Sequence, residues 1–208
     1  LEGYPHYADE LFMAYHYSKY INSLASEGRK ILDLPSYCNG WLYNKLGHYP
    51  HGTINPHVLD MYRAGGDALD FYSPNLYSLD YDPLFSGYKT GGNTLFIPES
   101  ILSPAGVLYA IGNYDAIGFA PYGIDDFDMN ADDTKLLAEV NKNLQQMENL
   151  LTNNFNSDKM QALYQASMAK NKSITMGDYI LSARSAESHR FAKDFGKSLE
   201  QAGKETIS

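Results

Sequence analysis

The chain has 208 residues, 44% of them hydrophobic, and this length and composition suit one domain or one domain with a piece of another. A formal net charge of -9 argues against a nucleic-acid partner, because phosphate binding requires clustered Lys and Arg. The single cysteine, Cys38, excludes an internal disulfide and a cysteine metal site, and no apolar run is long enough to span a bilayer.

Hydrophobic periodicity predicts helices that alternate with strands over residues 9–153. The predicted helices cover residues 9–27, 56–65, 104–111 and 134–153. The predicted strands cover residues 31–42, 68–77, 93–99 and 116–125. Asn55 and Ser103 are the expected N-caps of two helices, because each precedes a proline that suits the first helical turn.

Two of the predicted helices are amphipathic. The first carries its apolar side chains on one face, at Tyr17, Tyr20, Ile21, Leu24 and Ala25. The last carries them at Leu137, Val140, Leu144, Met147 and Leu151. After residue 157 the pattern changes, and we predict a helix over residues 157–171 and then a β-strand over residues 172–185.

The four strands are continuous apolar runs, which is typical of parallel strands that are covered on both faces. Two architectures have this pattern, an open doubly wound sheet and part of a (β/α)₈ barrel. No glycine-rich phosphate loop follows any of the strands, which argues against a nucleotide-binding doubly wound sheet. In a barrel, the polar groups at the C-terminal strand ends are the catalytic ones.

Polar and aromatic side chains stand where the predicted strands end, namely Asn39, Trp41, Asn75, Tyr77, Glu99, Tyr122 and Asp125. Amides and carboxylates hydrogen-bond sugar hydroxyls, and an aromatic ring covers the apolar face of a pyranose. A glutamate in this setting can attack an anomeric carbon, as in a retaining glycosidase. The strand ends therefore indicate a sugar-binding cleft.

Structural roles are the alternatives for each of these side chains. Glu99 would then be a solvated loop residue, Trp41 a core residue, Asn39 a turn cap and Tyr77 a buried tyrosine with a satisfied hydroxyl. The remaining candidates for chemistry are the histidines His48, His51 and His57, the thiol of Cys38 and the acidic residues 124–133. None of them has the spacing of a metal site or a nucleophile with a basic partner, so we expect neither a metal nor a cofactor.

Four segments, taken in order and spacing, resemble the second half of the catalytic barrel in bacterial β-galactosidase-like enzymes of glycoside hydrolase family 35. They are LPSYCNGWL (34–42), PHVLDMYRAGGDALDFYSPNLY (56–77), NTLFIPES (93–100) and LYAIGNYDAIGFAPYGIDD (108–126). The match covers roughly residues 8–126. SITMGDYILSA (173–183) resembles the opening of the all-β domain that follows this barrel in a subgroup of the family.

The resemblance implies an α/β fold in which the strands are the fifth to eighth of a (β/α)₈ TIM barrel. It implies residues 1–157 as a partial catalytic domain and residues 158–208 as a connecting helix with the start of a β domain. Glu99 would be the nucleophile of a retaining, double-displacement reaction on an oligosaccharide or terminal β-galactoside. Tyr77 would hydrogen-bond Glu99 over about 2.5–3.0 Å. The substrate-binding side chains would be Asn39, Trp41, Asn75 and Tyr122.

One departure from the family is important. Its general acid/base is a glutamate at the end of the fourth strand, and the only carboxylate in that region here, Glu2, lies in surroundings unlike the family's motif. The chain is therefore expected to be a fragment that lacks the N-terminal half of the barrel, and to be inactive alone. The alternative is a non-catalytic carbohydrate-binding or scaffold protein derived from such a barrel. The family also suggests export to the periplasm or secretion.

Overall fold

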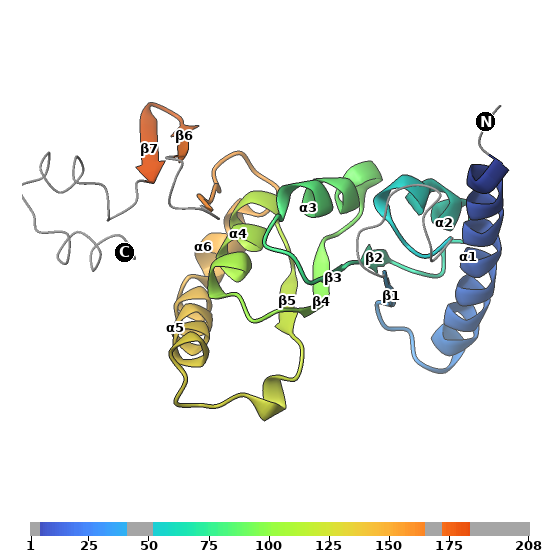
Figure 1. Ribbon diagram of the computed structural model, residues 1–208, viewed down its shortest axis with the longest axis horizontal. Helices are drawn as coiled ribbons and strands as arrows, with labels where there is room; N and C mark the ends of the chain where they lie inside the picture. The colour runs from blue at the N-terminus through green and yellow to red at the C-terminus, as the bar shows by residue number, and fades with distance from the viewer. Residues whose placement is uncertain (1–4, 41–51, 165–171, 184–208) are drawn as a thin grey trace, which may run out of the picture. The chain divides into compact units, whose positions relative to one another are not determined.

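The computed structural model describes residues 5–40, 52–164 and 172–183 (Figure 1). The chain divides into two compact units, residues 1–148 and residues 149–208. None of the helices in the described part is both long enough and apolar enough to cross a membrane.

The first unit alternates helices with short strands. Its helices are α1 (Pro5–Ile31), α2 (Leu59–Gly65), α3 (Asp82–Tyr88), α4 (Pro104–Tyr114) and α5 (Asp132–Gln146). Its strands are β1 (Tyr37–Asn39), β2 (Phe71–Ser73), β3 (Asn75–Leu76), β4 (Phe96–Ser100) and β5 (Gly118–Pro121). Short 3-10 helices cover Pro56–Val58, Thr90–Gly92 and Ile124–Asp126. The predicted alternation is present, but the strands are shorter than predicted.

The boundaries differ from the prediction for local reasons. Pro74 separates β2 from β3 within the single strand predicted over residues 68–77, because proline has no N–H to donate to a ladder. Ser103 caps α4 as predicted, and its Oγ accepts from Gly106 N at 3.1 Å. Asn55 occupies the predicted N-cap position, but its side chain makes no capping hydrogen bond. The helix predicted over residues 134–153 is interrupted at Met147.

All strand pairs of the first unit are parallel, as the apolar runs predicted. β1 pairs with β2, and β4 lies between β3 and β5. The chain after β1 continues beside the Pro74 break, since Gly40 N donates to Ser73 O at 2.5 Å and Asn75 N donates to Gly40 O at 3.3 Å. Strands that are neighbours in sequence are therefore neighbours in space, and their C-terminal ends meet at one edge.

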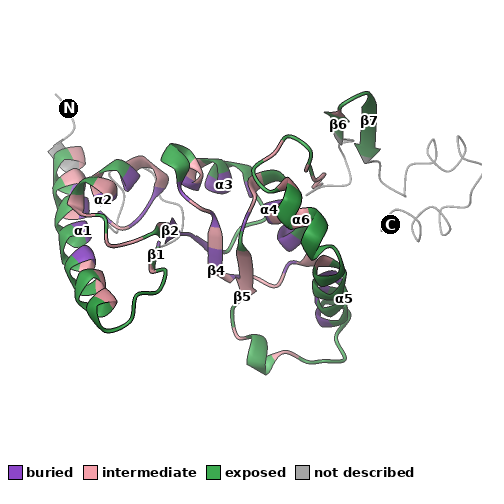
Figure 2. Ribbon diagram, turned by 180° about the vertical axis from the view of Figure 1, so that it is seen from behind, coloured by how far each residue is buried: buried purple, intermediate pink, exposed green. Residues whose placement is uncertain are grey.

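Helix α1 packs against α2 through small and polar side chains. Ala14, Ser18 and Asn22 are buried, and a Cβ on Gly65 would lie only 2.2 Å from Ser18 Oγ. The large side chains of α1 that were predicted to form its buried apolar face do not lie in this contact. Tyr20 and Leu24, for example, are 63% and 55% exposed. The close approach of the two helices explains this difference, because only small residues fit between them. Figure 2 shows the exposed outer side of α1.

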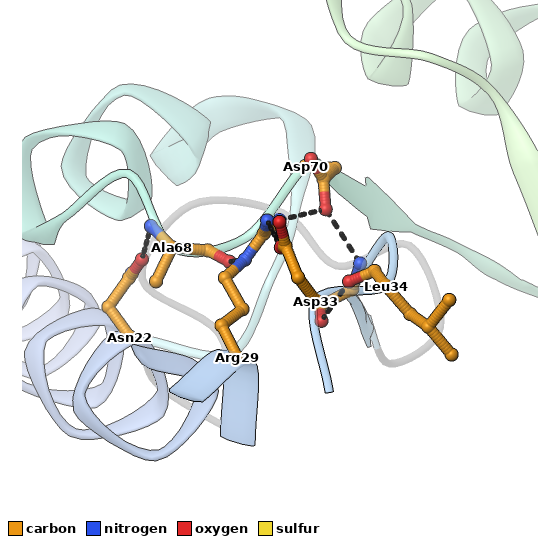
Figure 3. A network of polar contacts seen from close by, with 7 residues as sticks. Asn22, Arg29, Asp33, Leu34, Ala68 and Asp70 are labelled. Atoms are coloured by element: carbon orange, nitrogen blue, oxygen red, sulfur yellow. Dashed lines mark hydrogen bonds and ion pairs between the residues drawn. The ribbon is translucent and has the colours of Figure 1, made fainter. Parts of the chain in front are cut away.

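A polar network ties the end of α1 to the loop before β2 (Figure 3). Arg29 Nε donates to Ala68 O at 2.9 Å, and its guanidinium pairs with Asp70 and, at 3.0 Å, with Asp33. The Asp70 carboxylate also accepts from Ser36 N at 2.6 Å, one residue before β1. This network fixes where β1 begins relative to β2.

Helices α4 and α5 share a small apolar cluster in which Val107, Leu137 and Val140 are buried. The predicted apolar face of the last helix is thus correct for its first turns, whereas Met147 at the interruption is 38% exposed.

The second unit contains most of α6 (Glu148–Asn154) and an antiparallel hairpin, β6 (Lys172–Met176) and β7 (Tyr179–Ala183). The single strand predicted over residues 172–185 is therefore wrong, because Gly177, with a φ of 57°, allows a tight turn. The helix predicted from residue 157 is absent through residue 164, where the chain is irregular, and residues 165–171 lie outside the described residues.

Candidate functional site

Glu99 lies at the end of β4, where the ladder to β5 is irregular. Ile97 pairs with Phe119 and Ser100 with Pro121, so three steps along β4 match two along β5. Such a β-bulge changes the direction of a side chain and is common beside active sites. Ile97 is fully buried, whereas Glu99 is partly exposed. The bulge thus accompanies the change from a core side chain to one that reaches the rim of the sheet.

Tyr77 donates a hydrogen bond from its hydroxyl to Glu99 Oε1 at 2.5 Å, within the predicted range. The hydrogen bond to Glu99 raises the pKa of Tyr77 to about 12, with smaller contributions from burial and from the charges of Glu99 and Tyr122. The phenol therefore remains a donor at neutral pH. Among the described residues, the second carboxylate oxygen of Glu99 has no hydrogen-bond partner. Tyr77 thus holds one carboxylate oxygen of Glu99, while the other can contact a ligand.

Asn75 lies beside this pair, and a second asparagine contacts Asn75. Asn75 is directly opposite Glu99 in the β3–β4 ladder and is 7% exposed. Asn39, at the end of β1, donates from Nδ2 to Asn75 Oδ1 at 3.2 Å. The ends of β1, β3 and β4 thus bring together three of the predicted side chains.

Of the other two predicted substrate-binding residues, Tyr122 lies within the described part of the chain. Tyr122 follows β5, its backbone N–H donates to Ser100 O at 2.8 Å, and its side chain is 71% exposed. This backbone contact places Tyr122 next to the end of β4. Trp41 lies outside the described residues.

Below the amides lies an aromatic layer that sequence reasoning missed. The ring of Tyr37 stacks on Phe71 at 5.6 Å and meets Phe96 edge-on at 4.9 Å. Tyr37 precedes Asn39 by two residues and so lies on the same face of β1. A Cβ on Gly118 would lie 2.7 Å from the Phe96 ring, so glycine leaves room for the layer. The signal in the sequence was one such aromatic residue in each of the first three predicted strands.

Two cavities border the site. One, of about 300 Å³, lies between the end of β3 and α3 and is lined by Asn75, Tyr77 and Leu84, among others. The second, of about 430 Å³, is lined by Asn39, Asn75 and Tyr62, among others. Volumes of this size suit small ligands, and Asn75 belongs to both walls.

The remaining candidates have structural partners or unsuitable surroundings. His57 Nε2 contacts Glu10 Oε1 at 2.8 Å, and Glu10 is 1% exposed. Burial raises the pKa of the Cys38 thiol, which disfavours the thiolate that a nucleophile needs. Within the described residues no group of three or more His, Cys, Asp or Glu could hold a metal ion, and His48 and His51 lie outside them.

The chain matches no protein-family model and no curated protein.

Proposed function

We propose that the chain is part of a retaining glycoside hydrolase that acts on terminal β-galactosides, with Glu99 as the nucleophile. The observation that carries the proposal is the geometry of Glu99, a carboxylate at a strand end with one oxygen bonded to Tyr77. A nucleophilic carboxylate needs one oxygen fixed and the other directed at the reacting carbon.

In the proposed reaction, Glu99 attacks the anomeric carbon and a covalent bond forms between them. The bond from that carbon to the leaving oxygen breaks, and this oxygen takes a proton from a general acid. A water molecule, deprotonated by the same group acting as base, then attacks the anomeric carbon and releases Glu99 and the sugar. Asn75, Tyr122 and Trp41 would contact the sugar, and Tyr77 would keep Glu99 oriented.

The general acid is proposed to come from an N-terminal half of a (β/α)₈ barrel that these residues do not include. The proposed barrel would account for two features. The strands are parallel and follow one another in space as they do in sequence. Apolar side chains are exposed in the segments that lead into the outer strands, with Leu34 before β1 at 56% and Ile117 before β5 at 53%. Within the described residues the outer edges of β1 and β5 have no partner strand, and in parallel sheets such edges are usually covered.

The outer side of α1 supports the same proposal. Phe12, Tyr20 and Leu24 lie at multiples of four residues and are 62%, 63% and 55% exposed. With the exposed His16, whose ring centroid lies 4.3 Å from that of Phe12, they form one row of mostly aromatic side chains along the helix. A preceding helix and strand of the same barrel would bury it.

A non-catalytic carbohydrate-binding protein is the second candidate. It is favoured because, among the described residues, Glu99 is the only carboxylate to which the proposed reaction gives a role. Covalent labelling separates the two, because a lectin-like protein binds a sugar without forming an ester.

The test uses the full-length protein and an activated 2-fluoro galactoside, followed by mass spectrometry of the labelled peptide. We expect the label on Glu99, and Glu99→Gln should abolish both labelling and turnover. Glu139→Gln on α5, also an exposed glutamate, is the matched control and should leave both unchanged. Labelling elsewhere, or full turnover by Glu99→Gln, would disprove the assignment.

A further inference from the structure

The two asparagines beside Glu99 occupy different positions relative to it. Asn75 is its direct neighbour in the β3–β4 ladder. Asn39 is exposed and lies opposite Ser73 in the β1–β2 ladder, one strand further away. A side chain at Asn75 can therefore share a ligand with Glu99 more readily than one at Asn39.

The hydrogen bond between the asparagines orients the inner one. Asn39 Nδ2 donates to Asn75 Oδ1 at 3.2 Å. When the oxygen of an amide is held on one side, its NH₂ group is presented on the other. Among the described residues Asn75 Nδ2 has no hydrogen-bond partner, and Asn75 lines both cavities. Its NH₂ group is available to a ligand.

The backbone holds the two asparagines at a fixed separation. Gly40, between them in the ladder, donates to Ser73 O and accepts from Asn75 N. A Cβ on Gly40 would lie 2.2 Å from the Tyr88 hydroxyl and 2.9 Å from Ile54 O, so the chain is closely packed at this point. The Asn39 side chain consequently meets Asn75 in one geometry.

We propose that Asn39 is a positioning residue, which holds the Asn75 amide so that Asn75 Nδ2 donates to an acceptor oxygen of the sugar bound at Glu99. This rests on the proposed glycosidase function. It assigns the substrate contact to Asn75 and gives Asn39, which the family resemblance placed toward the substrate, an indirect role.

A double-mutant cycle in the full-length protein tests the proposal, with kcat and KM measured on an aryl β-galactoside. Asn75→Ala should lower kcat/KM about tenfold, the effect of one lost hydrogen bond in the transition state. Asn39→Ala should lower it about fivefold. Because both act through one amide, the double variant should show about a tenfold loss, not the roughly fiftyfold loss of independent residues.

Asn39→Asp adds a sharper comparison. The substitution keeps the size of the side chain, but its carboxylate can only accept hydrogen bonds and cannot donate one to Asn75 Oδ1. Its carboxylate should attract Asn75 Nδ2 and turn the amide away from the sugar, so kcat/KM should fall at least as far as in Asn39→Ala. In the Asn75→Ala background the same substitution should have no effect on kcat/KM.

Three outcomes would overturn the positioning role. Multiplicative losses in the cycle would mean that Asn39 contacts the substrate itself. Lower Tm values with unchanged kcat/KM for the Asn39 variants would mean that the bond is only structural. If the wild-type protein is neither labelled nor active, the proposed function fails and this inference fails with it. If labelling and activity depend on Glu99 but the losses in kcat/KM are multiplicative, the positioning role is refuted and the proposed function stands.

Discussion

Gly65 is a position of close approach between α2 and α1, and replacing it tests the packing of these two helices. A Cβ there would lie 2.2 Å from Ser18 Oγ and 2.5 Å from Ser18 Cβ. Ser18 is fully buried, and its hydroxyl donates to Tyr62 O, so it cannot turn away without loss. Gly65→Ala must therefore separate the helices or break that hydrogen bond.

The magnitude follows from three opposing effects. Alanine favours a helix over glycine by about 1 kcal/mol. Overpacking of a buried contact costs about 1–3 kcal/mol, and loss of the buried hydrogen bond costs about 1 kcal/mol more. We therefore expect Gly65→Ala to lower the free energy of unfolding by about 1–3 kcal/mol.

Urea unfolding of the full-length protein measures this loss as a lower midpoint at unchanged slope. Gly28→Ala in α1 is the matched control, because no heavy atom lies within 4 Å of the added Cβ. That substitution should raise the midpoint, by up to about 1 kcal/mol in free energy. If Gly65→Ala were as stable as the wild type, α2 would not be held against α1 at this distance, and the explanation for the small residues of α1 would be wrong.

Three further predictions concern the site. Tyr77→Phe removes the bond to Glu99 and should lower kcat about tenfold with little change in the urea midpoint, because Tyr77 is 45% exposed; an unchanged kcat would show that Glu99 needs no such partner. Glu99 raises the pKa of Tyr77 to about 12, so Glu99→Gln should lower that pKa. The variant should then show more phenolate than the wild type by ultraviolet absorbance at about pH 11 while folded, and equal phenolate content would contradict the cause given for the shift. The 208-residue chain alone should not hydrolyse aryl β-galactosides, because retaining chemistry requires two carboxyl groups about 5–5.5 Å apart; turnover above that of its Glu99→Gln variant would place an acid within these residues.

The positions of the elements could be predicted from the sequence because they depend on local patterns, whereas the contact between Tyr77 and Glu99 was implied by the family resemblance. Apolar runs separated by helical segments predict parallel neighbours, and strands adjacent in sequence proved adjacent in space. Tyr77 and Glu99 follow the ends of two such neighbours. Their meeting at 2.5 Å therefore required only that these two strands pair.

The orientation of α1 could not be predicted, because it depends on what the helix packs against. Its large residues, Tyr20 and Leu24, predicted the buried face by hydrophobicity alone. The structure buries Ser18 and Asn22 instead, since Gly65 and Gly66 bring α2 too close for larger side chains. Steric fit decided this contact, and a pattern of hydrophobicity contains no information on the width of the facing groove.

The bulge in β4 and the break at Pro74 both affect the face of the sheet on which the side chains of the site lie. An unbroken strand alternates strictly, and a one-residue shift turns every later side chain to the other face. The bulge between Ile97 and Ser100 and the break at Pro74 each change that alternation within a few residues of the rim. Asn75 and Glu99 nevertheless remain opposite each other, and Tyr77, two residues beyond Asn75, reaches the same carboxylate. The irregular strand ends therefore place an amide and a phenol around one carboxylate, while the Tyr37, Phe71 and Phe96 rings pack together below.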